Sequence, residues 1–137
     1  MSVVYAVDVT ITTPVHETEL PDRVERAVRN LFPEADIERT DGELRGEAHG
    51  LAAFAEQLHE QAILDTARET FFENRDGDTT AFRLKKAAAF EGVVNFAVGS
   101  ADELGEIHVE VTVREPSFEA YVDHVAPPTE DGEPVVD

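Results

Sequence analysis

Two segments of this chain alternate strictly between apolar and polar residues. Val3–Thr12 and Glu106–Val113 each place a Val, Ile or Tyr side chain at almost every second position. A period of two is typical of a strand that buries one face and leaves the other in water. Both segments are therefore predicted to be half-buried strands.

A helix is predicted over residues 21–32, between Pro21 in its first turn and Pro33, which stops it. Four apolar residues at helical spacing form one buried stripe: Val24, Ala27, Val28 and Leu31. The pairs Asp22–Arg26 and Glu25–Arg29 are spaced i, i+4. This spacing favours a salt-bridged solvent face over a basic ridge.

The longest helical segment is predicted over Leu51–Arg75. The apolar residues of its first half and those of its second half, Ile63, Ala67 and Phe71, point in almost opposite directions at 100° per residue. A single straight surface helix would not show this pattern. Either the helix is kinked or broken near residues 60–62, which we favour, or its end is sandwiched between the sheet and another surface, such as a second copy.

The remaining elements are predicted from shorter patterns. Ile37–Thr40 and Glu43–Ala48 form a hairpin around Asp41-Gly42, and Asn74–Asp78 forms a loop. Four further elements follow: strand Thr80–Lys86, a short helix or loop Lys86–Phe90, strand Val93–Val98 and helix Pro116–Val125.

The predicted order is β-α-β-β-α-β-β-β-α. Hairpins with few crossovers indicate the α+β class, with a mostly antiparallel sheet and helices packed on one face. We expect one domain over residues 1–126. Residues 127–137 are rich in Pro and acid and are predicted to be a disordered tail.

Composition excludes several classes of protein. No cysteine is present, so disulfides and thiolate zinc sites are excluded. No apolar run is long enough for a membrane span, and the N-terminus lacks the pattern of a signal peptide, so a cytoplasmic protein is expected. The 30 acidic and 11 basic residues give a net charge of −19. Their even spread favours a surface adapted to high salt over an acidic partner-binding surface.

The few positive charges are unevenly placed. Residues 79–101 hold Arg83, Lys85 and Lys86 but only one acid, and these two lysines are the only ones in the chain. In the strand predicted there, Phe82 points inward, so Arg83 and Lys85 lie on the opposite, exposed face. This basic island is the best candidate for a binding site.

No catalytic, metal or cofactor site is predicted. None of the five histidines forms an HExxH motif, and His108 is interpreted as a surface residue. Asn74, Asp76 and Asp78 resemble part of a calcium loop but lack the bidentate Glu that would follow. The chain is therefore expected not to be an enzyme.

Four segments together resemble an archaeal family catalogued as uncharacterized protein family 0201, or domain of unknown function 54. They are Gln61–Arg68, Phe82–Gly92, Val94–Phe96 and Leu104–Val109, within a resemblance that covers about Val3–Val113. The family usually reads Asn-Lys-Gln-Ala-Ala where this chain has Lys85-Lys86-Ala87-Ala88-Ala89. Lys86 matches the family lysine, whereas Lys85 and Ala87 depart from the pattern.

The resemblance implies a fold similar to ribosomal large-subunit protein five and a role in RNA binding. It leaves a homodimer open. The first hypothesis is thus a non-catalytic RNA-binding module. Its candidate contacts are Arg83, Lys85 and Lys86, assisted by Arg68 and Asn95. The alternative is a protein-interaction or regulatory subunit working with a P-loop nucleotide-kinase-like partner, an association that the family also carries.

Overall fold

The computed structural model describes residues 4–97, 105–130 and 133–134. Its elements are β1 (Ala6–Pro14), α1 (Pro21–Leu31), β2 (Asp36–Thr40), β3 (Glu43–Ala48), α2 (Ala52–Glu60), α3 (Leu64–Glu73), β4 (Arg75–Asp76), β5 (Thr79–Lys85), α4 (Lys86–Phe90), β6 (Glu106–Glu115), α5 (Phe118–Val125), β7 (Thr129–Glu130) and β8 (Glu133–Pro134).

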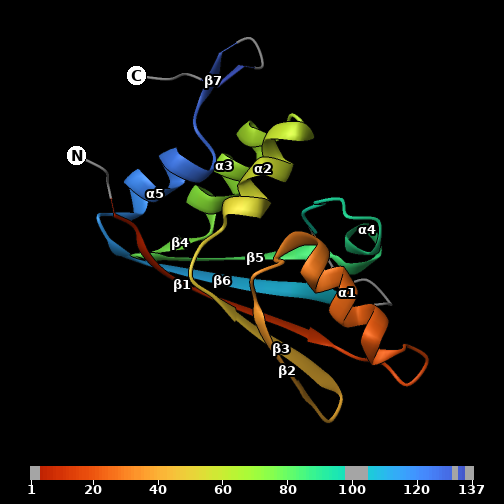
Figure 1. The fold of residues 1–137 in the computed structure, drawn as a ribbon. Helices are drawn as coiled ribbons and strands as arrows, with labels where there is room; N and C mark the ends of the chain where they lie inside the picture. The colour runs from red at the N-terminus through yellow and green to blue at the C-terminus, as the bar shows by residue number, and fades with distance from the viewer. Residues whose placement is uncertain (1–3, 98–104, 131–132, 135–137) are drawn as a thin grey trace.

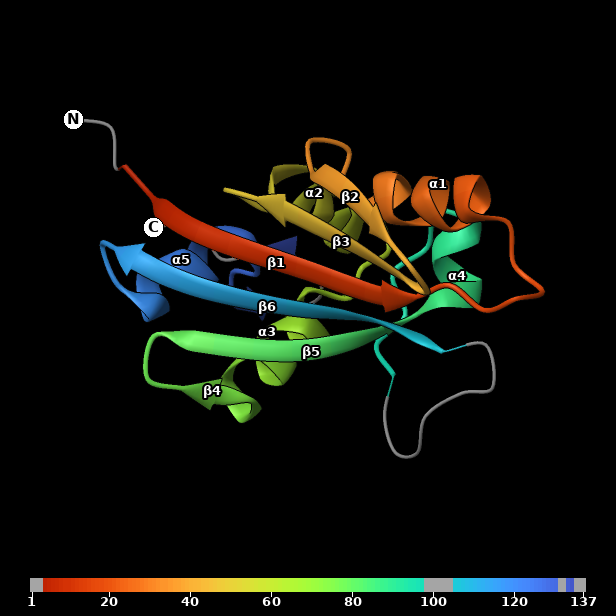
Figure 2. The ribbon, with the colours of Figure 1, turned by 90° about the horizontal axis from the view of Figure 1, so that it is seen from below.

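Six strands form one sheet in the order β2-β3-β1-β6-β5-β4, and every pairing in it is antiparallel. The helices cover one face of this sheet (Figure 1). From below, the sheet lies in front of the helices and its other face is uncovered (Figure 2). The predicted α+β class, with an antiparallel sheet and helices on one face, is confirmed.

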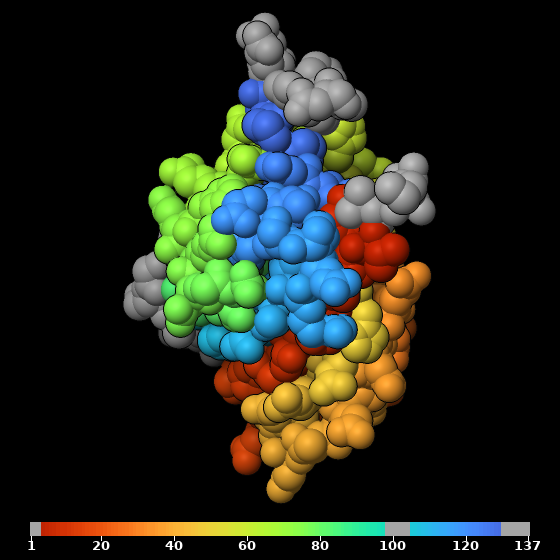
Figure 3. All heavy atoms as spheres, turned by 90° about the vertical axis from the view of Figure 1, so that its left-hand side faces the viewer, coloured from red at the N-terminus to blue at the C-terminus, as the bar shows by residue number. Residues whose placement is uncertain are grey.

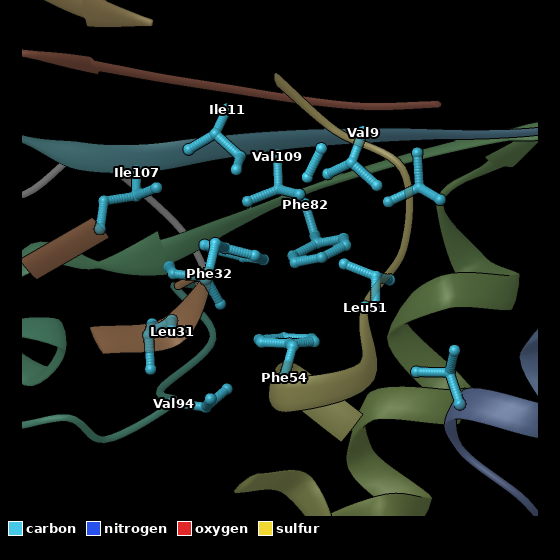
Figure 4. Close-up of a cluster of buried hydrophobic side chains, with 14 of the residues drawn as sticks. Val9, Ile11, Leu31, Phe32, Leu51, Phe54, Phe82, Val94, Ile107 and Val109 are labelled. Carbon is cyan, nitrogen blue, oxygen red and sulfur yellow. The ribbon is translucent and has the colours of Figure 1, made fainter. Parts of the chain in front are cut away.

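The core lies between the sheet and the helices. Val7, Val9 and Ile11 of β1 are at most 1% exposed, as the alternation predicted. The inward side chains of the strands point toward Phe54 of α2 (Figure 4). The ring of Phe54 stacks on Phe32 and Phe82, with centroid distances of 5.3 and 5.8 Å. These aromatic contacts join α2 and the residue that follows α1 to strand β5 of the sheet.

Helix α1 buries its predicted stripe, because all four of its apolar residues are inaccessible or nearly so. The predicted Glu25–Arg29 pair is present at 3.2 Å. The predicted Asp22–Arg26 pair is wrong. Asp22 instead accepts a hydrogen bond from Arg39 of β2, and Arg39 also donates to Glu25. The Asp22 carboxylate, which the i, i+4 spacing paired with Arg26, is therefore bound by a residue of a strand.

The long helical segment is broken where its apolar pattern changes direction. Helix α2 ends at Glu60, α3 begins at Leu64, and Ala62 between them has a φ of 57°, a left-handed conformation that ends the first helix. Ala67 and Phe71 are then buried within this chain, which removes the need for a second copy to cover them. The favoured interpretation is confirmed.

The strand predicted at Val93–Val98 is wrong over its described part. Up to residue 97, only Phe96 forms a bridge, to Leu84, and Val98 lies outside the described residues. Around Phe96 the segment still runs beside β5, because the Lys85 amide donates to the Asn95 carbonyl at 2.8 Å and the Ala97 amide donates to the Arg83 carbonyl at 2.9 Å. Just before it, the Gln61 side-chain amide donates to the Val94 carbonyl at 2.9 Å and accepts from the Val94 amide at 2.8 Å, so a side chain satisfies the Val94 backbone.

Helix α5 closes one end of the molecule. Its surface fills the space between the β4 region and the start of β1 (Figure 3). Arg75 binds Glu119 at 2.7 Å and lies over the Phe118 ring, while the Tyr5 ring stacks on His124. After α5, β7 pairs with β8. The predicted disorder of the tail falls partly on residues 131–132 and 135–137, outside the described residues, and stays a prediction.

Candidate nucleic-acid interface on the open sheet face

The five residues predicted to contact RNA do not lie together. Arg83 and Lys85 occupy alternate positions of β5 on the open face, where both are half-buried. Asn95 is exposed, and it lies beside Lys85 because its carbonyl accepts a hydrogen bond from the Lys85 amide at 2.8 Å. Arg68 and Lys86 lie elsewhere. The structure thus brings three of the five residues together.

Lys86 is buried completely, so the prediction that it is presented to a partner is wrong. The strand ends at Lys85, and Lys86 begins α4, so its side chain turns into the protein instead of continuing the alternation. Its Nζ donates to the Pro14 carbonyl at 2.7 Å and to the Glu19 carboxylate at 3.0 Å. Lys86 therefore ties α4 to the turn after β1.

Arg68 belongs to the helix layer, on the other side of the sheet from the open face. It binds Asp123 at 2.7 Å, donates to the Ala126 carbonyl at 3.3 Å, and lies over the Phe72 ring at 5.1 Å. These contacts connect α3 to α5. Because the sheet separates Arg68 from Arg83, the predicted assistance of Arg68 at a shared site is also wrong.

Arg83 combines a structural contact with partial exposure. Its guanidinium binds the carboxylate of Glu106 at 2.9 Å, and the side chain of Glu106 is only 3% exposed. A carboxylate so far from water needs such a partner. The Arg83 side chain is 33% exposed, so part of it is accessible from the open face.

Strand register places Arg83 in a row of polar side chains across the sheet. Thr12 of β1 lies opposite Arg45 of β3 and His108 of β6, and His108 lies opposite Arg83 of β5. Directly opposite residues of antiparallel strands point to the same face. Arg45 and His108 are exposed, and Arg45 makes no ion pair within the part of the chain that the structure describes. We call Arg45, Thr12, His108 and Arg83 the cationic row; beyond its end on β3, the exposed Glu38 of β2 lies opposite Arg45.

Sequence reasoning missed two members of the cationic row. Alternation already placed Arg45 and His108 on the outward faces of their strands, and His108 was interpreted as a surface residue. Only the pairing of β3 with β1, and of β6 with both β1 and β5, shows that they align with Arg83. Signals of this kind depend on register between distant segments, which local patterns do not contain.

A second row lies two residues further along the strands. It contains Glu47, Thr10, Glu110 and Ala81, which oppose one another on β3, β1, β6 and β5. Glu47 and Glu110 are exposed. We call this set the acidic row. The open face therefore carries a row with two arginines and a histidine beside a row with two exposed carboxylates.

A hollow of about 770 Å³ covers parts of both rows. Its open-face lining includes Arg45, Arg83, His108, Glu110 and Ala81. Further lining comes from the strands, through Thr10, Thr12, Phe82 and Val109, and from the end of α3 and the segment after α4, through Thr70, Glu73, Asn74, Phe96 and Ala97. The hollow thus extends from the sheet face toward the β5 side of the molecule.

The shifted pKa values lie on the helix side of the molecule. Hydrogen bonding from Arg29 and Arg39 holds the pKa of Glu25 below its ordinary value. The Glu119 pKa is lowered by its own backbone amide and by Arg75. Burial raises the pKa of Tyr121, whose hydroxyl accepts a hydrogen bond from the Leu51 amide at 3.0 Å. Each shift thus has a structural cause in helix packing.

Two other kinds of site were sought over residues 4–97, 105–130 and 133–134. No group of three or more His, Asp or Glu side chains there has the arrangement of a metal site. Within the same residues, no helix has both the length and the apolar character needed to cross a bilayer.

A family model described as RNA binding matches residues 8–113 of the chain. A UPF0200/UPF0201 protein of Archaeoglobus fulgidus is 39% identical over 94% of this chain, which spans only 40% of that relative. A UPF0201 protein of Methanopyrus kandleri is 38% identical, with 93% of this chain and 89% of the relative covered.

Solved structures agree with the fold. The crystal structure of a UPF0201 protein from Methanococcus jannaschii superposes with a TM-score of 0.87 at 31% identity, covering 94% of this chain and 99% of that one. A second UPF0201 crystal structure gives a TM-score of 0.84 at 37% identity, covering 93% of this chain and 99% of the other.

Proposed function

This chain belongs to the archaeal UPF0201 family, and we propose that it is a non-catalytic RNA-binding protein whose contacts lie on the open sheet face. The observation that carries the proposal is the cationic row, which aligns two arginines and a histidine across four strands. The RNA-binding description of the matching family model supports the same function.

The proposed contacts differ from those expected from sequence. Arg45 and Lys85 are the principal contacts, because neither is used in an ion pair within the described residues. Arg83 adds its accessible part while it remains bound to Glu106. Asn95 supplies an exposed amide beside Lys85. Guanidinium and ammonium groups on a surface are the usual partners of phosphate oxygens.

We leave catalysis out of the proposal because of where the shifted pKa values lie. Active sites commonly gather groups whose pKa values are displaced. In this chain the displaced values belong to the α1–β2 contact and to α5, and ion pairs, hydrogen bonds or burial explain them. The open face instead offers cations and hydroxyls, which suit binding.

The affinity is expected to be modest and sensitive to salt. Three phosphate contacts on a single strand give a slope of log affinity against log salt concentration of about −2. The net charge of −19 repels RNA from most of the surface and thereby favours binding at the cationic row and the neighbouring Lys85. We further propose a cytoplasmic location and a salt-adapted surface, for which this acid excess is the supporting feature.

Fluorescence anisotropy with labelled RNA, over a series of salt concentrations, tests the proposed function. Replacing Arg45 with Gln, or Lys85 with Gln, should weaken binding and flatten the salt slope by about 0.7 for each lost contact. The matched control is Arg26→Gln, which removes one charge from an exposed position of α1 in the helix layer. Equal losses in Arg26→Gln and Arg45→Gln, or no RNA binding at all, would contradict the proposal.

The alternative suggested by the family resemblance is our second proposal. In it, the chain is a regulatory subunit for a P-loop nucleotide-kinase-like partner. The name of the Archaeoglobus relative joins two families, and most of that protein lies beyond the region this chain matches. Co-purification under native salt, with and without nuclease, separates the two functions. A homodimer and a likeness to ribosomal large-subunit protein five also stay proposals.

A further inference from the structure

We infer that the hollow on the open face holds one unstacked nucleotide of a single RNA strand, and that a double helix does not dock there. The inference rests on the proposed RNA-binding function and specifies its substrate class. Three features of the described residues carry it: the narrowness of the cationic row, the carboxylates beside it, and the volume of the hollow.

The cationic row matches one phosphate backbone. It crosses four strands, so its length is about 14 Å at the spacing of neighbouring strands. The acidic row runs parallel to it at a distance of about 7 Å, two residues along each strand. A double helix has phosphates on two strands, and recognition of double-stranded RNA uses contacts spread over about 16 base pairs. Its second strand would therefore meet Glu47 and Glu110.

The carboxylates of the acidic row suit the base side of a nucleotide. A carboxylate accepts hydrogen bonds from the exocyclic amino group of cytosine, but it repels phosphate. With the phosphate on the cationic row, the base of the same nucleotide points toward Glu110 and into the hollow. An RNA strand in this orientation places its phosphate on the cationic row and its base beside the carboxylates of the acidic row.

The hollow has the size and lining that an inserted base needs. Its volume of about 770 Å³ is within the range of small-molecule pockets. Ala81 leaves space on β5, and Phe96 forms part of the lining while its ring packs against Phe54, Phe71 and Phe82 of the core. In a double helix the bases are already stacked and paired, so only an unpaired nucleotide can enter.

The test uses the full chain and three labelled RNAs: a cytidine oligomer and a uridine oligomer of about ten nucleotides, and a duplex of about 16 base pairs, the length that duplex-binding domains span. We expect the cytidine strand to bind about tenfold more tightly than the duplex. We also expect it to bind about fivefold more tightly than the uridine strand, because uracil has no amino group for Glu110.

Two variants connect the result to the hollow. Ala81→Leu fills part of it without a change in charge and should weaken binding of the cytidine strand about fivefold. The control Ala87→Leu makes the same change at an exposed position of α4 and should have no effect. Glu110→Gln should bring the affinities for the two single strands within about twofold of each other.

Different results overturn different statements. Duplex binding as tight as that of the single strands, with Arg45→Gln still weakening it, overturns the nucleotide inference and leaves RNA binding standing. An unchanged affinity in Ala81→Leu also overturns the inference. If none of the three RNAs binds, the proposed function fails, and the inference fails with it.

Discussion

The two faces of the sheet differ in how their side chains are used. On the helix-covered face, Val9 and Ile11 pack against aromatic rings and are inaccessible to water. On the open face, the residue between them, Thr10, lies in the acidic row beside exposed carboxylates. One strand therefore contributes to the core and to the candidate interface through alternate positions.

Charged residues show the same difference more sharply. In the helix layer and at its edges, Lys86, Arg68 and Arg39 each bind a carboxylate of another element. On the open face, Arg83 binds Glu106 and Arg114 binds Asp8, whereas Arg45 has no carboxylate partner within the described residues. The partners of each individual cation, and not the local density of basic residues, therefore decide whether it is available to a ligand.

The largest expected effect is a difference in unfolding free energy between substitutions on the two faces of the sheet. Phe54→Ala removes a fully buried ring that contacts three other rings, and should lower the free energy of unfolding by about 3–5 kcal/mol. Thr12→Ala on the open face should change it by no more than about 0.5 kcal/mol. Urea denaturation followed by circular dichroism measures both values. Similar losses of unfolding free energy in the two variants would mean that side chains on the open face also stabilise the fold.

The next effect compares a buried cation with an exposed one. Lys86→Gln leaves the Glu19 carboxylate, which is 10% exposed, without its charged partner, and should cost about 3 kcal/mol of unfolding free energy. Arg45→Gln should cost less than about 0.5 kcal/mol. RNA affinity should change in the opposite order, with Lys86→Gln close to the wild type once folded. If the Lys86→Gln protein folded but lost RNA binding, Lys86 would have to be counted among the RNA contacts.

A smaller effect concerns the break between α2 and α3. Ala62 adopts a left-handed conformation, which costs an ordinary residue about 1–2 kcal/mol. Ala62→Gly should therefore raise the free energy of unfolding by about 1 kcal/mol, whereas Ala53→Gly inside α2 should lower it by about 1 kcal/mol. Thermal unfolding distinguishes the two signs. A loss in both variants would indicate that the Ala62 side chain contributes packing that outweighs its strain.

The smallest effect is a change in pH dependence. The pKa of Glu25 is lowered by Arg29 and Arg39, so its contribution to stability is present above its unfolded pKa and is lost as pH falls through the folded value. Arg39→Gln should raise the Glu25 pKa toward its ordinary value, so that the contribution becomes smaller and its loss is complete at a higher pH. Carboxyl NMR titration measures the shift, and an unchanged Glu25 pKa would show that Arg29 alone sets it.

Local patterns in the sequence predicted the covered face well. The alternation in β1, the apolar stripe of α1 and the break near Ala62 are all consequences of burial within short segments. The candidate site was less predictable. Lys86 changes direction because a strand ends one residue before it, and the segment after α4 pairs with β5 only around Phe96. The cationic row depends on register between segments far apart in the chain.

Crosslinking with a 4-thiouridine-containing single-stranded RNA, followed by mass spectrometry of the attached peptides, tests most directly that RNA lies on the open face. The account predicts crosslinks in β3, β5 and β6, with Arg45→Gln reducing them and Arg26→Gln leaving them unchanged. Crosslinks concentrated in α1, α2 or α5, with the open-face strands unlabelled, would contradict it.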